Sequence, residues 1–169
     1  MTKKIILITG GSGMVGRQAN FGIKPSHSEL DILDPKSINK AIKFYKPNVI
    51  VHLAAMVNML ACEKNPAAAA QINVKGTQNL TEACKKNKIK LVYVSTCTVF
   101  GGGKSSADKA TPYKEKDKPH PLNVYGKTKW RGELMAKKIL PKVLIIRTGW
   151  LFGGGTDVDT KFVNLIFKK

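Results

Sequence analysis

The sequence predicts an α/β protein with a Rossmann-like, doubly wound parallel sheet flanked by helices. First, an apolar run at residues 5–8 leads directly into a glycine-rich turn, G-x-x-G-x-x-G, formed by Gly10, Gly13 and Gly16. Second, apolar runs alternate with helical patterns along the chain, which is typical of parallel strands joined by right-handed crossovers. Third, small and hydroxyl-bearing residues follow these runs, at the sheet edge where such proteins bind ligands.

Each glycine of the turn has a physical role in a dinucleotide site. Gly10 permits a tight turn, Gly13 lets the backbone approach a pyrophosphate, and Gly16 lets the next helix close onto the strand. The N–H groups at the start of that helix, together with its dipole, attract phosphate. The turn therefore predicts a nucleotide site, although an ordinary strand–turn–helix with loop glycines has the same pattern.

The segment after Arg17 is short for a complete crossover helix and second strand. Gly22 and Pro25 interrupt it, so we expect a stunted first helix and a marginal second strand. A ribose-binding acid is expected about 20 residues after the glycines. The acids within residues 29–31 come too early or lie in the wrong element. NAD(H) and NADP(H) therefore both stay open, and Arg17 and Lys24 slightly favour a 2′-phosphate.

Two crossover helices are predicted in the middle of the chain. Residues 34–46 open with Asp-Pro, the residue types preferred at the N-cap and first helical position, and apolar residues then recur at helical spacing. A long helix is expected over residues 65–86, where Asn-Pro forms the start. Asn73 is a polar residue on this helix, and a plain surface position is as good an interpretation as a site.

Three further strands complete the predicted sheet. Ala54 and Ala55 end the first of them with small side chains, which leave room for a cofactor. His52 lies in the same run, and we expect a hydrogen-bonded core histidine rather than a site residue. The three strands are the apolar runs at residues 49–55, 91–95 and 143–147.

Tyr125 and Lys129 lie four residues apart on a helix predicted for residues 123–140, so they share one face. Lysine is frequent here, so context matters: the pair follows the strand-end Thr96 after a long polar loop, residues 101–121. A lysine ammonium about 4 Å away would favour the phenolate by about 4 kcal/mol and bring the Tyr125 pKa near ~7. We expect Tyr125 to act as the acid, Thr96 to polarise a carbonyl and Lys129 to hold a nicotinamide ribose.

The composition argues against several other classes of protein, such as membrane, secreted and disulfide-bonded proteins. The chain has 169 residues, 43% of them hydrophobic, which suits one domain with a core. No apolar run approaches the ~18 residues of a membrane span, and the N-terminal run is too short for a signal peptide. Cys62, Cys84 and Cys97 are odd in number and lack CxxC spacing. We therefore expect reduced thiols, no disulfide, no metal site and a cytoplasmic location.

The formal net charge is +18, from 29 Lys and Arg against 11 Asp and Glu. Such a balance is compatible with nucleic-acid binding. Only three of the basic residues are arginine, however, which is the residue that reads bases and phosphates in a bidentate manner. The lysines are also scattered over every predicted helix. We expect a solvated basic surface, with steering of anionic ligands as the alternative, and neither a nucleic-acid nor a membrane partner.

These motifs together resemble the extended short-chain dehydrogenase/reductases. Residues 121–129, PLNVYGKTK, are similar to the dTDP-4-dehydrorhamnose reductase and sugar-nucleotide-binding family, as are residues 30–34, 73–77 and 112–115. The resemblance implies a Rossmann fold, NADP(H) or NAD(H), and reduction of a 4-keto nucleotide sugar, as in dTDP-rhamnose biosynthesis; it leaves a homodimer open. The alternatives are a nucleotide-sugar epimerase or dehydratase, and a non-catalytic nucleotide-sugar- or NAD(P)-binding regulatory protein.

The resemblance also implies site residues. Thr96, Tyr125 and Lys129 are the implied catalytic residues. The implied cofactor-binding residues are Gly10, Gly13, Met14, Val15, Gly16, Asp31, Ile32, Ala54, Ala55, Met56, Asn73, Tyr125 and Lys129.

Two departures from the family pattern matter. The family run Ser-Thr-Asp-Tyr-Val-Phe is replaced at residues 95–100 by Ser-Thr-Cys-Thr-Val-Phe, which leaves the identity of the sugar open. In the family a C-terminal substrate domain follows the Rossmann domain. We therefore expect an NAD(P)-binding domain over residues 1–152 and the start of a truncated substrate-binding region over residues 153–169.

Overall fold

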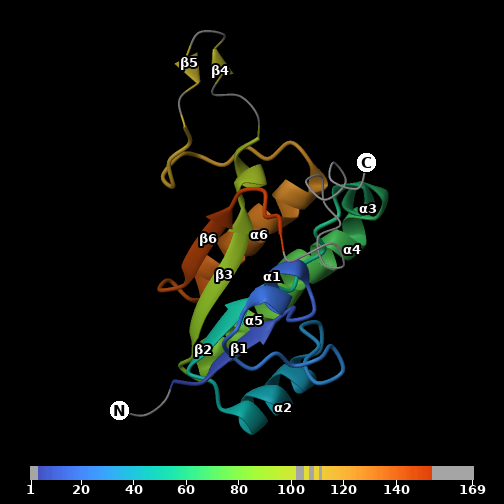
Figure 1. Ribbon diagram of the computed structural model, residues 1–169, viewed down its shortest axis with the longest axis vertical. Helices are drawn as coiled ribbons and strands as arrows, with labels where there is room; N and C mark the ends of the chain where they lie inside the picture. The colour runs from blue at the N-terminus through green and yellow to red at the C-terminus, as the bar shows by residue number, and fades with distance from the viewer. Residues whose placement is uncertain (1–3, 102–104, 107–108, 111, 154–169) are drawn as a thin grey trace.

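The structure, a computed structural model, describes residues 4–101, 105–106, 109–110 and 112–153. Helices and strands alternate along the chain (Figure 1). The elements are β1 (Ile6–Thr9), α1 (Met14–Gln18), α2 (Pro35–Tyr45), β2 (Val49–His52), α3 (Met59–Lys64), α4 (Pro66–Ala70), the π-helical segment η1 (Gln71–Gly76), α5 (Thr77–Lys86), β3 (Lys90–Thr96), the 3-10 turn η2 (Cys97–Phe100), β4 (Ser105–Ser106), β5 (Lys109–Ala110), α6 (Val124–Ile139) and β6 (Leu144–Thr148).

The central sheet is parallel, with strand order β1-β2-β3-β6. The predicted Rossmann-like α/β fold is therefore confirmed. Thr9 pairs with His52, and Thr96 pairs with Thr148, so the carboxyl ends of these strands meet at one edge. On the outer side of β1, Ile23 makes a single parallel bridge to Leu7. This bridge and the five-residue α1 confirm the expected marginal second strand and stunted first helix.

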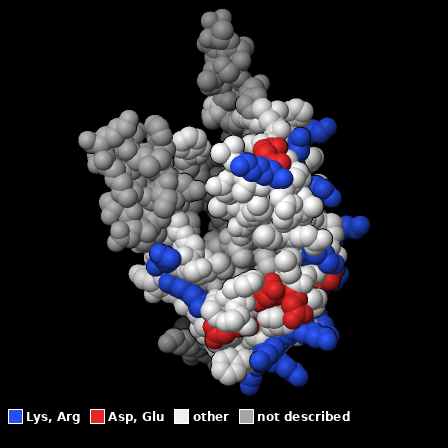
Figure 2. All heavy atoms as spheres, turned by 90° about the vertical axis from the view of Figure 1, so that its right-hand side faces the viewer, with Lys and Arg blue, Asp and Glu red and all other residues white. Residues whose placement is uncertain are grey.

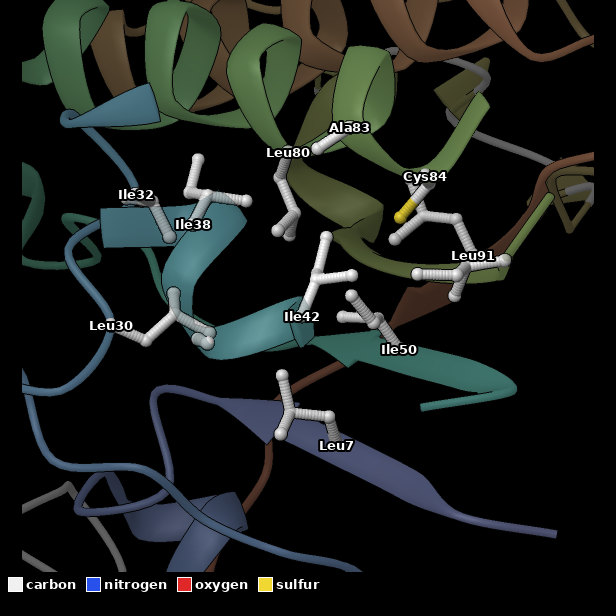
Figure 3. Packing of buried hydrophobic residues seen from close by; sticks show 12 residues of the cluster. Leu7, Leu30, Ile32, Ile38, Ile42, Ile50, Leu80, Ala83, Cys84 and Leu91 are labelled. Atoms are coloured by element: carbon white, nitrogen blue, oxygen red, sulfur yellow. The ribbon is translucent and has the colours of Figure 1, made fainter. Parts of the chain in front are cut away.

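The hydrophobic core lies between the sheet and helices α2 and α5 (Figure 3). Strand residues meet helix residues that lie three or four positions apart, because both sets point into the same layer. Full burial of each of these aliphatic side chains is worth about 1.5–3 kcal/mol. The leucines and isoleucines of this cluster are Leu7, Leu30, Ile32, Ile38, Ile42, Ile50, Leu80, Ile89 and Leu91.

The helix starts agree with the polar residues that precede them. The Asp34 side chain accepts a hydrogen bond from Lys36 N at 2.8 Å, and Pro35 is the first residue of α2. Asn65 caps α4 and Asn123 caps α6 in the same way. Helix α2 ends at Tyr45, and its C-cap, Lys46, has a left-handed φ of 48° immediately before Pro47. These helix boundaries follow from local chemistry, which is why the sequence predicts them well.

Three local features differ from the prediction. The single helix expected over residues 65–86 consists of α4, η1 and α5, and a further helix, α3, precedes it. Strand β2 stops at His52, so residues 53–55 leave the sheet as a loop. The long polar loop carries a small antiparallel pair, β4 and β5. The short amphipathic piece expected at residues 162–169 lies outside the described residues.

The surface is basic but not arranged as a single stripe. Figure 2 shows lysines and arginines distributed over one face of the molecule, with acidic side chains among them. Within the described part of the chain, no helix is long and apolar enough to cross a membrane. The scattered charge agrees with a solvated basic surface.

Candidate active site

A cavity of about 870 Å³ lies at the edge where the parallel strands end. Its volume is within the usual range for small-molecule and cofactor sites. The segments that follow β1, β2, β3 and β6 build its wall, together with the start of α6. Predicted site residues in this wall are Gly10, Gly13, Met14, Val15, Gly16, Asp31, Ile32, Ala54, Ala55, Thr96, Tyr125 and Lys129.

The glycine turn is closely packed against the end of β2. Gly10 has a φ of 70°, and a Cβ there would lie 2.6 Å from Ala54 N. A Cβ on Gly16 would lie 2.5 Å from Gly10 O, so only glycine lets α1 close on the turn. Helix α1 begins at Met14, and its N-cap, Gly13, provides no capping side chain. Its first N–H groups are therefore available to a ligand in the cavity.

His52 is a core residue, as expected. Its side chain is fully buried, with Nδ1 2.8 Å from Thr9 Oγ1 and Nε2 3.1 Å from Thr77 Oγ1. Burial, together with the charge of Lys129, lowers the pKa of His52 to about 3. The neutral imidazole joins the strand before the glycine turn to the start of α5.

Asn73 is buried, so the interpretation of this residue as a surface position is wrong. Its Oδ1 accepts from Met56 N at 2.8 Å, and its Nδ2 donates to Met56 O at 3.1 Å and to Thr128 Oγ1 at 3.0 Å. Met56 and Asn73 are absent from the described cavity wall, unlike the other predicted site residues. Asn73 instead fastens the loop after β2 to the helix that carries Tyr125.

Thr96 and Tyr125 lie side by side at the end of β3. The Thr96 hydroxyl donates to Thr98 Oγ1 at 2.9 Å, and it is close enough to the phenol to lower the pKa of Tyr125. Burial raises the pKa of Tyr125 above its usual value, and the hydrogen bond with Thr96 opposes this rise. The phenol is therefore protonated at neutral pH, as a proton donor must be.

Lys129 interacts with β3 and not, as expected, with the Tyr125 phenol. Lys129 Nζ donates to Val94 O at 2.8 Å and lies 4.2 Å from the centroid of the Tyr93 ring. Burial lowers the pKa of Lys129 to about 7, and Glu133 opposes this fall. The prediction that Lys129 brings the Tyr125 pKa down is thus wrong for this structure, because burial dominates the phenol and β3 holds the ammonium.

A second layer of interactions holds β6 and the loop before α6. Arg147 Nη2 lies 2.6 Å from Glu133 Oε2, and its guanidinium packs 4.8 Å from the Phe100 ring centroid. Arg147 Nη1 also donates to Glu115 O at 3.2 Å. This ion pair, between the buried Glu133 and the partly buried Arg147, joins α6 to β6. Sequence reasoning missed it, because nothing in the local pattern relates residues so far apart.

Several wall residues were also not predicted. Trp150 lies in the wall after β6, and Ser95 lies beside Thr96 at the end of β3. Their only signal in the sequence is that they follow apolar strands. The further unpredicted wall residues include Ser12, His27, Leu53, Val57, Met59, Thr98 and Thr148.

Comparison with known proteins shows the family to which the chain belongs. Residues 3–169 match the family described as RmlD substrate binding domain. The dTDP-4-dehydrorhamnose reductase of Aggregatibacter actinomycetemcomitans is 38% identical over 157 residues, which cover 88% of this chain and 52% of that protein. The methionine adenosyltransferase 2 subunit beta of Bos taurus is 31% identical over 179 residues, covering 97% and 52% of the two chains.

A solved structure shares the fold closely. The dTDP-4-dehydrorhamnose reductase of Bacillus anthracis, crystallised in complex with NADP, superposes with a TM-score of 0.88 at 30% identity. The match covers 99% of this chain and 60% of that one. The chain thus spans about half the length of the curated relatives it matches.

Proposed function

Because the chain belongs to the RmlD substrate binding domain family, we propose that it serves the NADPH-dependent reduction of a 4-keto nucleotide sugar. One observation carries the proposal: Thr96, Tyr125 and Lys129 line the same cavity as the glycine turn. A proton donor and a phosphate-binding turn in one cavity are what a nicotinamide-dependent carbonyl reduction requires. The relatives named dTDP-4-dehydrorhamnose reductase support the same substrate class.

The residues in the cavity wall fit a dinucleotide. Gly10 and Gly16 have no room for a Cβ, so the turn presents backbone at the place where a pyrophosphate binds. Ser95 Oγ is buried in the wall and has no hydrogen-bond partner among the described residues, which leaves one polar group for a ligand. Small residues after β2, Ala54 and Ala55, leave space beside the turn.

Arg17 and Lys24 are the residues placed to bind the 2′-phosphate of NADPH. Ile23 pairs with β1, so Lys24 stands directly after this short second strand, where NAD-binding proteins carry an acid. Its side chain packs against Gly11, since a Cβ there would lie 2.6 Å from Lys24 Cβ. Arg17 Nε donates to Ser12 O at 2.8 Å and is held on the same turn. Two cations and no acid at this position favour NADPH over NADH.

The chain's own residues supply the proton chemistry. When bound, NADPH supplies the hydride for the carbonyl carbon. Tyr125, protonated because burial raises its pKa, gives its proton to the carbonyl oxygen as that oxygen gains charge. Thr96 lies next to the phenol, so its hydroxyl borders the same oxygen. Lys129, whose pKa burial lowers to about 7, lines the same wall, and β3 holds its amino group in place.

Tyr125→Phe tests the assigned role of the phenol. We expect NADPH fluorescence to change on mixing with the wild-type chain and with Tyr125→Phe alike, because the phenol is not needed for phosphate binding. Turnover, followed as loss of NADPH absorbance with dTDP-, UDP- and GDP-linked 4-keto sugars, should fall at least about 100-fold in the variant. Unchanged turnover would show that the phenol is not the acid.

A non-catalytic binding role is the second candidate. The specific observation in its favour is 31% identity, over nearly the whole chain, to methionine adenosyltransferase 2 subunit beta, which is named as a subunit of another enzyme. The two candidates separate in one experiment. Binding of NADPH without oxidation by any 4-keto sugar favours the regulatory role, whereas oxidation that depends on Tyr125 favours the reductase.

A further inference from the structure

A buried chain of hydrogen bonds passes through His52, next to the residue that precedes the glycine turn. On one side of the ring, Nδ1 lies 2.8 Å from Thr9 Oγ1, and on the other, Nε2 lies 3.1 Å from Thr77 Oγ1. Thr77 Oγ1 donates to Asn73 O at 2.8 Å, and Thr9 Oγ1 accepts from Ala54 N at 3.3 Å. The chain therefore runs from the start of α5, through the imidazole, to the loop after β2.

The proton count on Thr77 assigns the tautomer of His52. A threonine hydroxyl has one proton to donate and two acceptor lone pairs. The Thr77 proton goes to Asn73 O, the carbonyl four residues earlier, as is common for threonine in a helical segment. Thr77 also acts on the Tyr93 phenol, where it lowers the pKa, and a proton shared with that oxygen would be equally lost to His52. Thr77 is therefore the acceptor, and His52 Nε2 carries the proton.

This tautomer fixes the direction of the bond between His52 and Thr9. A neutral imidazole has one N–H group and one acceptor nitrogen, and burial keeps His52 neutral by lowering its pKa to about 3. Because Nε2 is the donor, Nδ1 is the acceptor, and the Thr9 hydroxyl donates to it. The lone pairs of the Thr9 oxygen are then left to accept the Ala54 N–H.

The loop that Thr9 holds lies against the glycine turn. A Cβ on Gly10 would lie 2.6 Å from Ala54 N, so the two backbones are in close contact. Leu53 N donates to Thr9 O at 3.2 Å, so Thr9 binds the loop through both its backbone and its hydroxyl. Thr9, Gly10 and Ala54 all line the cavity. A shift of this loop would therefore change the shape of the cavity beside the turn.

We propose that His52 is a positioning residue of the cofactor cavity: Nδ1 takes the Thr9 proton and thereby keeps the Thr9 oxygen on Ala54 N. This inference rests on the proposed function in taking the cavity as the NADPH site. Without an acceptor at Nδ1, the buried Thr9 hydroxyl would rotate toward another partner, because an unpaired buried donor is costly. Its oxygen would then leave Ala54 N, and the loop would lose one of its two bonds to Thr9.

Two variants separate the roles of the two ring nitrogens. In His52→Asn, the amide oxygen can replace Nδ1 as the acceptor for Thr9, whereas the donor to Thr77 is lost. In His52→Gln, the longer side chain can replace Nε2 as the donor to Thr77, whereas the acceptor for Thr9 is lost. Each variant removes one hydrogen bond, so we expect a similar loss of stability in both. Only His52→Gln should disturb the cavity.

Amide hydrogen exchange, followed by NMR, measures the loop directly and needs no cofactor. We expect the Ala54 amide to exchange about fivefold faster in His52→Gln than in wild type, and at the wild-type rate in His52→Asn. Thr9→Val keeps the side-chain shape and removes the hydroxyl, so it should behave as His52→Gln does. The Leu53 amide, which is bound to the Thr9 backbone, is the internal control and should not change.

NADPH affinity tests the consequence for binding. Fluorescence titration should show about fivefold weaker binding in His52→Gln and Thr9→Val, and wild-type affinity in His52→Asn. Equal Ala54 exchange or equal affinity in the two His52 variants would overturn the proposal, as would 15N shifts that place the His52 proton on Nδ1. If the wild-type chain binds no NADPH, the proposed function fails, whereas fast Ala54 exchange confined to His52→Gln and Thr9→Val would still support the positioning of the loop by His52.

Discussion

At the scale of single residues, burial decides what the titratable groups of this protein do. His52, Tyr125 and Lys129 all have pKa values displaced toward the neutral form by burial. Desolvation penalises charge more than the neighbouring groups stabilise it. As a result, His52 is neutral and the Tyr125 phenol is protonated, while the pKa of Lys129 is about 7.

His52 gives a pH dependence whose sign is fixed by its lowered pKa. The unfolded chain binds a proton on this residue below about pH 6.5, whereas the folded protein does not until about pH 3. Stability is therefore lost as the pH falls between these values. We expect the free energy of unfolding to fall by about 1.4 kcal/mol more per pH unit in wild type than in His52→Gln. Urea unfolding between pH 6 and pH 4 measures both slopes, and parallel slopes would contradict this account.

Arg17 and Lys24 give a prediction on cofactor choice. Either residue changed to Gln should weaken NADPH binding about fivefold and leave NADH binding unchanged, because only NADPH has the 2′-phosphate. Fluorescence titration of both cofactors measures this difference. Lys86→Gln, at the far end of α5, is the matched control for loss of one positive charge and should alter neither affinity. Equal weakening of NADPH and NADH binding would show that Arg17 and Lys24 contact a part of the dinucleotide that both cofactors share.

At the scale of elements, close packing of α6 sets the position of the catalytic side chains. Gly132 lies where α6 crosses η1 and β3: a Cβ there would lie 2.6 Å from both Asn73 O and Tyr93 Oη. The ion pair of Glu133 and Arg147 holds the same part of the helix to β6. Tyr125 and Lys129, which precede this crossing on the same helix, depend on it for their place in the cavity.

Gly132→Ala should therefore disturb the site through the helix. We expect a loss of about 1–3 kcal/mol in the free energy of unfolding, since the added methyl group forces α6 away from backbone that cannot yield. Gly149→Ala is the control, because a Cβ there meets nothing within 4 Å among the described residues. Chemical denaturation of the two variants gives the comparison. Similar stability for both would show that α6 adjusts freely at this crossing.

At the scale of the whole molecule, the charge of +18 acts on any anionic ligand that approaches. Lysines spread over the surface produce a broad positive potential rather than a specific contact. Such a field accelerates the encounter with a polyanion and is screened within about 8 Å at physiological salt.

We expect this field to affect the association rate of NADPH more than its dissociation rate. Raising salt from about 20 mM to about 200 mM should slow association several-fold and leave dissociation nearly constant. Stopped-flow fluorescence separates the two rates. NADH, with less negative charge, should show the smaller salt dependence. If salt changes only the dissociation rate of NADPH, the positive charges act by direct contact with the cofactor instead.

The sequence by itself determined the class of fold, the starts of α2, α4 and α6, and the part of the cavity wall formed by the glycine turn, Thr96, Tyr125 and Lys129. The signals that allowed this are local: apolar runs, Asp-Pro and Asn-Pro caps, and the glycine turn. Each predicts the structure of the few residues around it. Residues that follow parallel strands meet at one sheet edge whatever the details of packing. For this reason the order of residues along the chain is enough to place Thr96, Tyr125 and the glycines together.

Only the tertiary structure decided what those residues touch. The π-helical segment that turns Asn73 inward, the bond from Lys129 to Val94 and the ion pair of Arg147 with Glu133 join segments far apart in the chain. Their hydrogen bonds and desolvation depend on atoms that local patterns do not bring together. For the same reason the pKa of Tyr125 moves opposite to the prediction: spacing on a helix sets which residues share a face, but burial sets their charge.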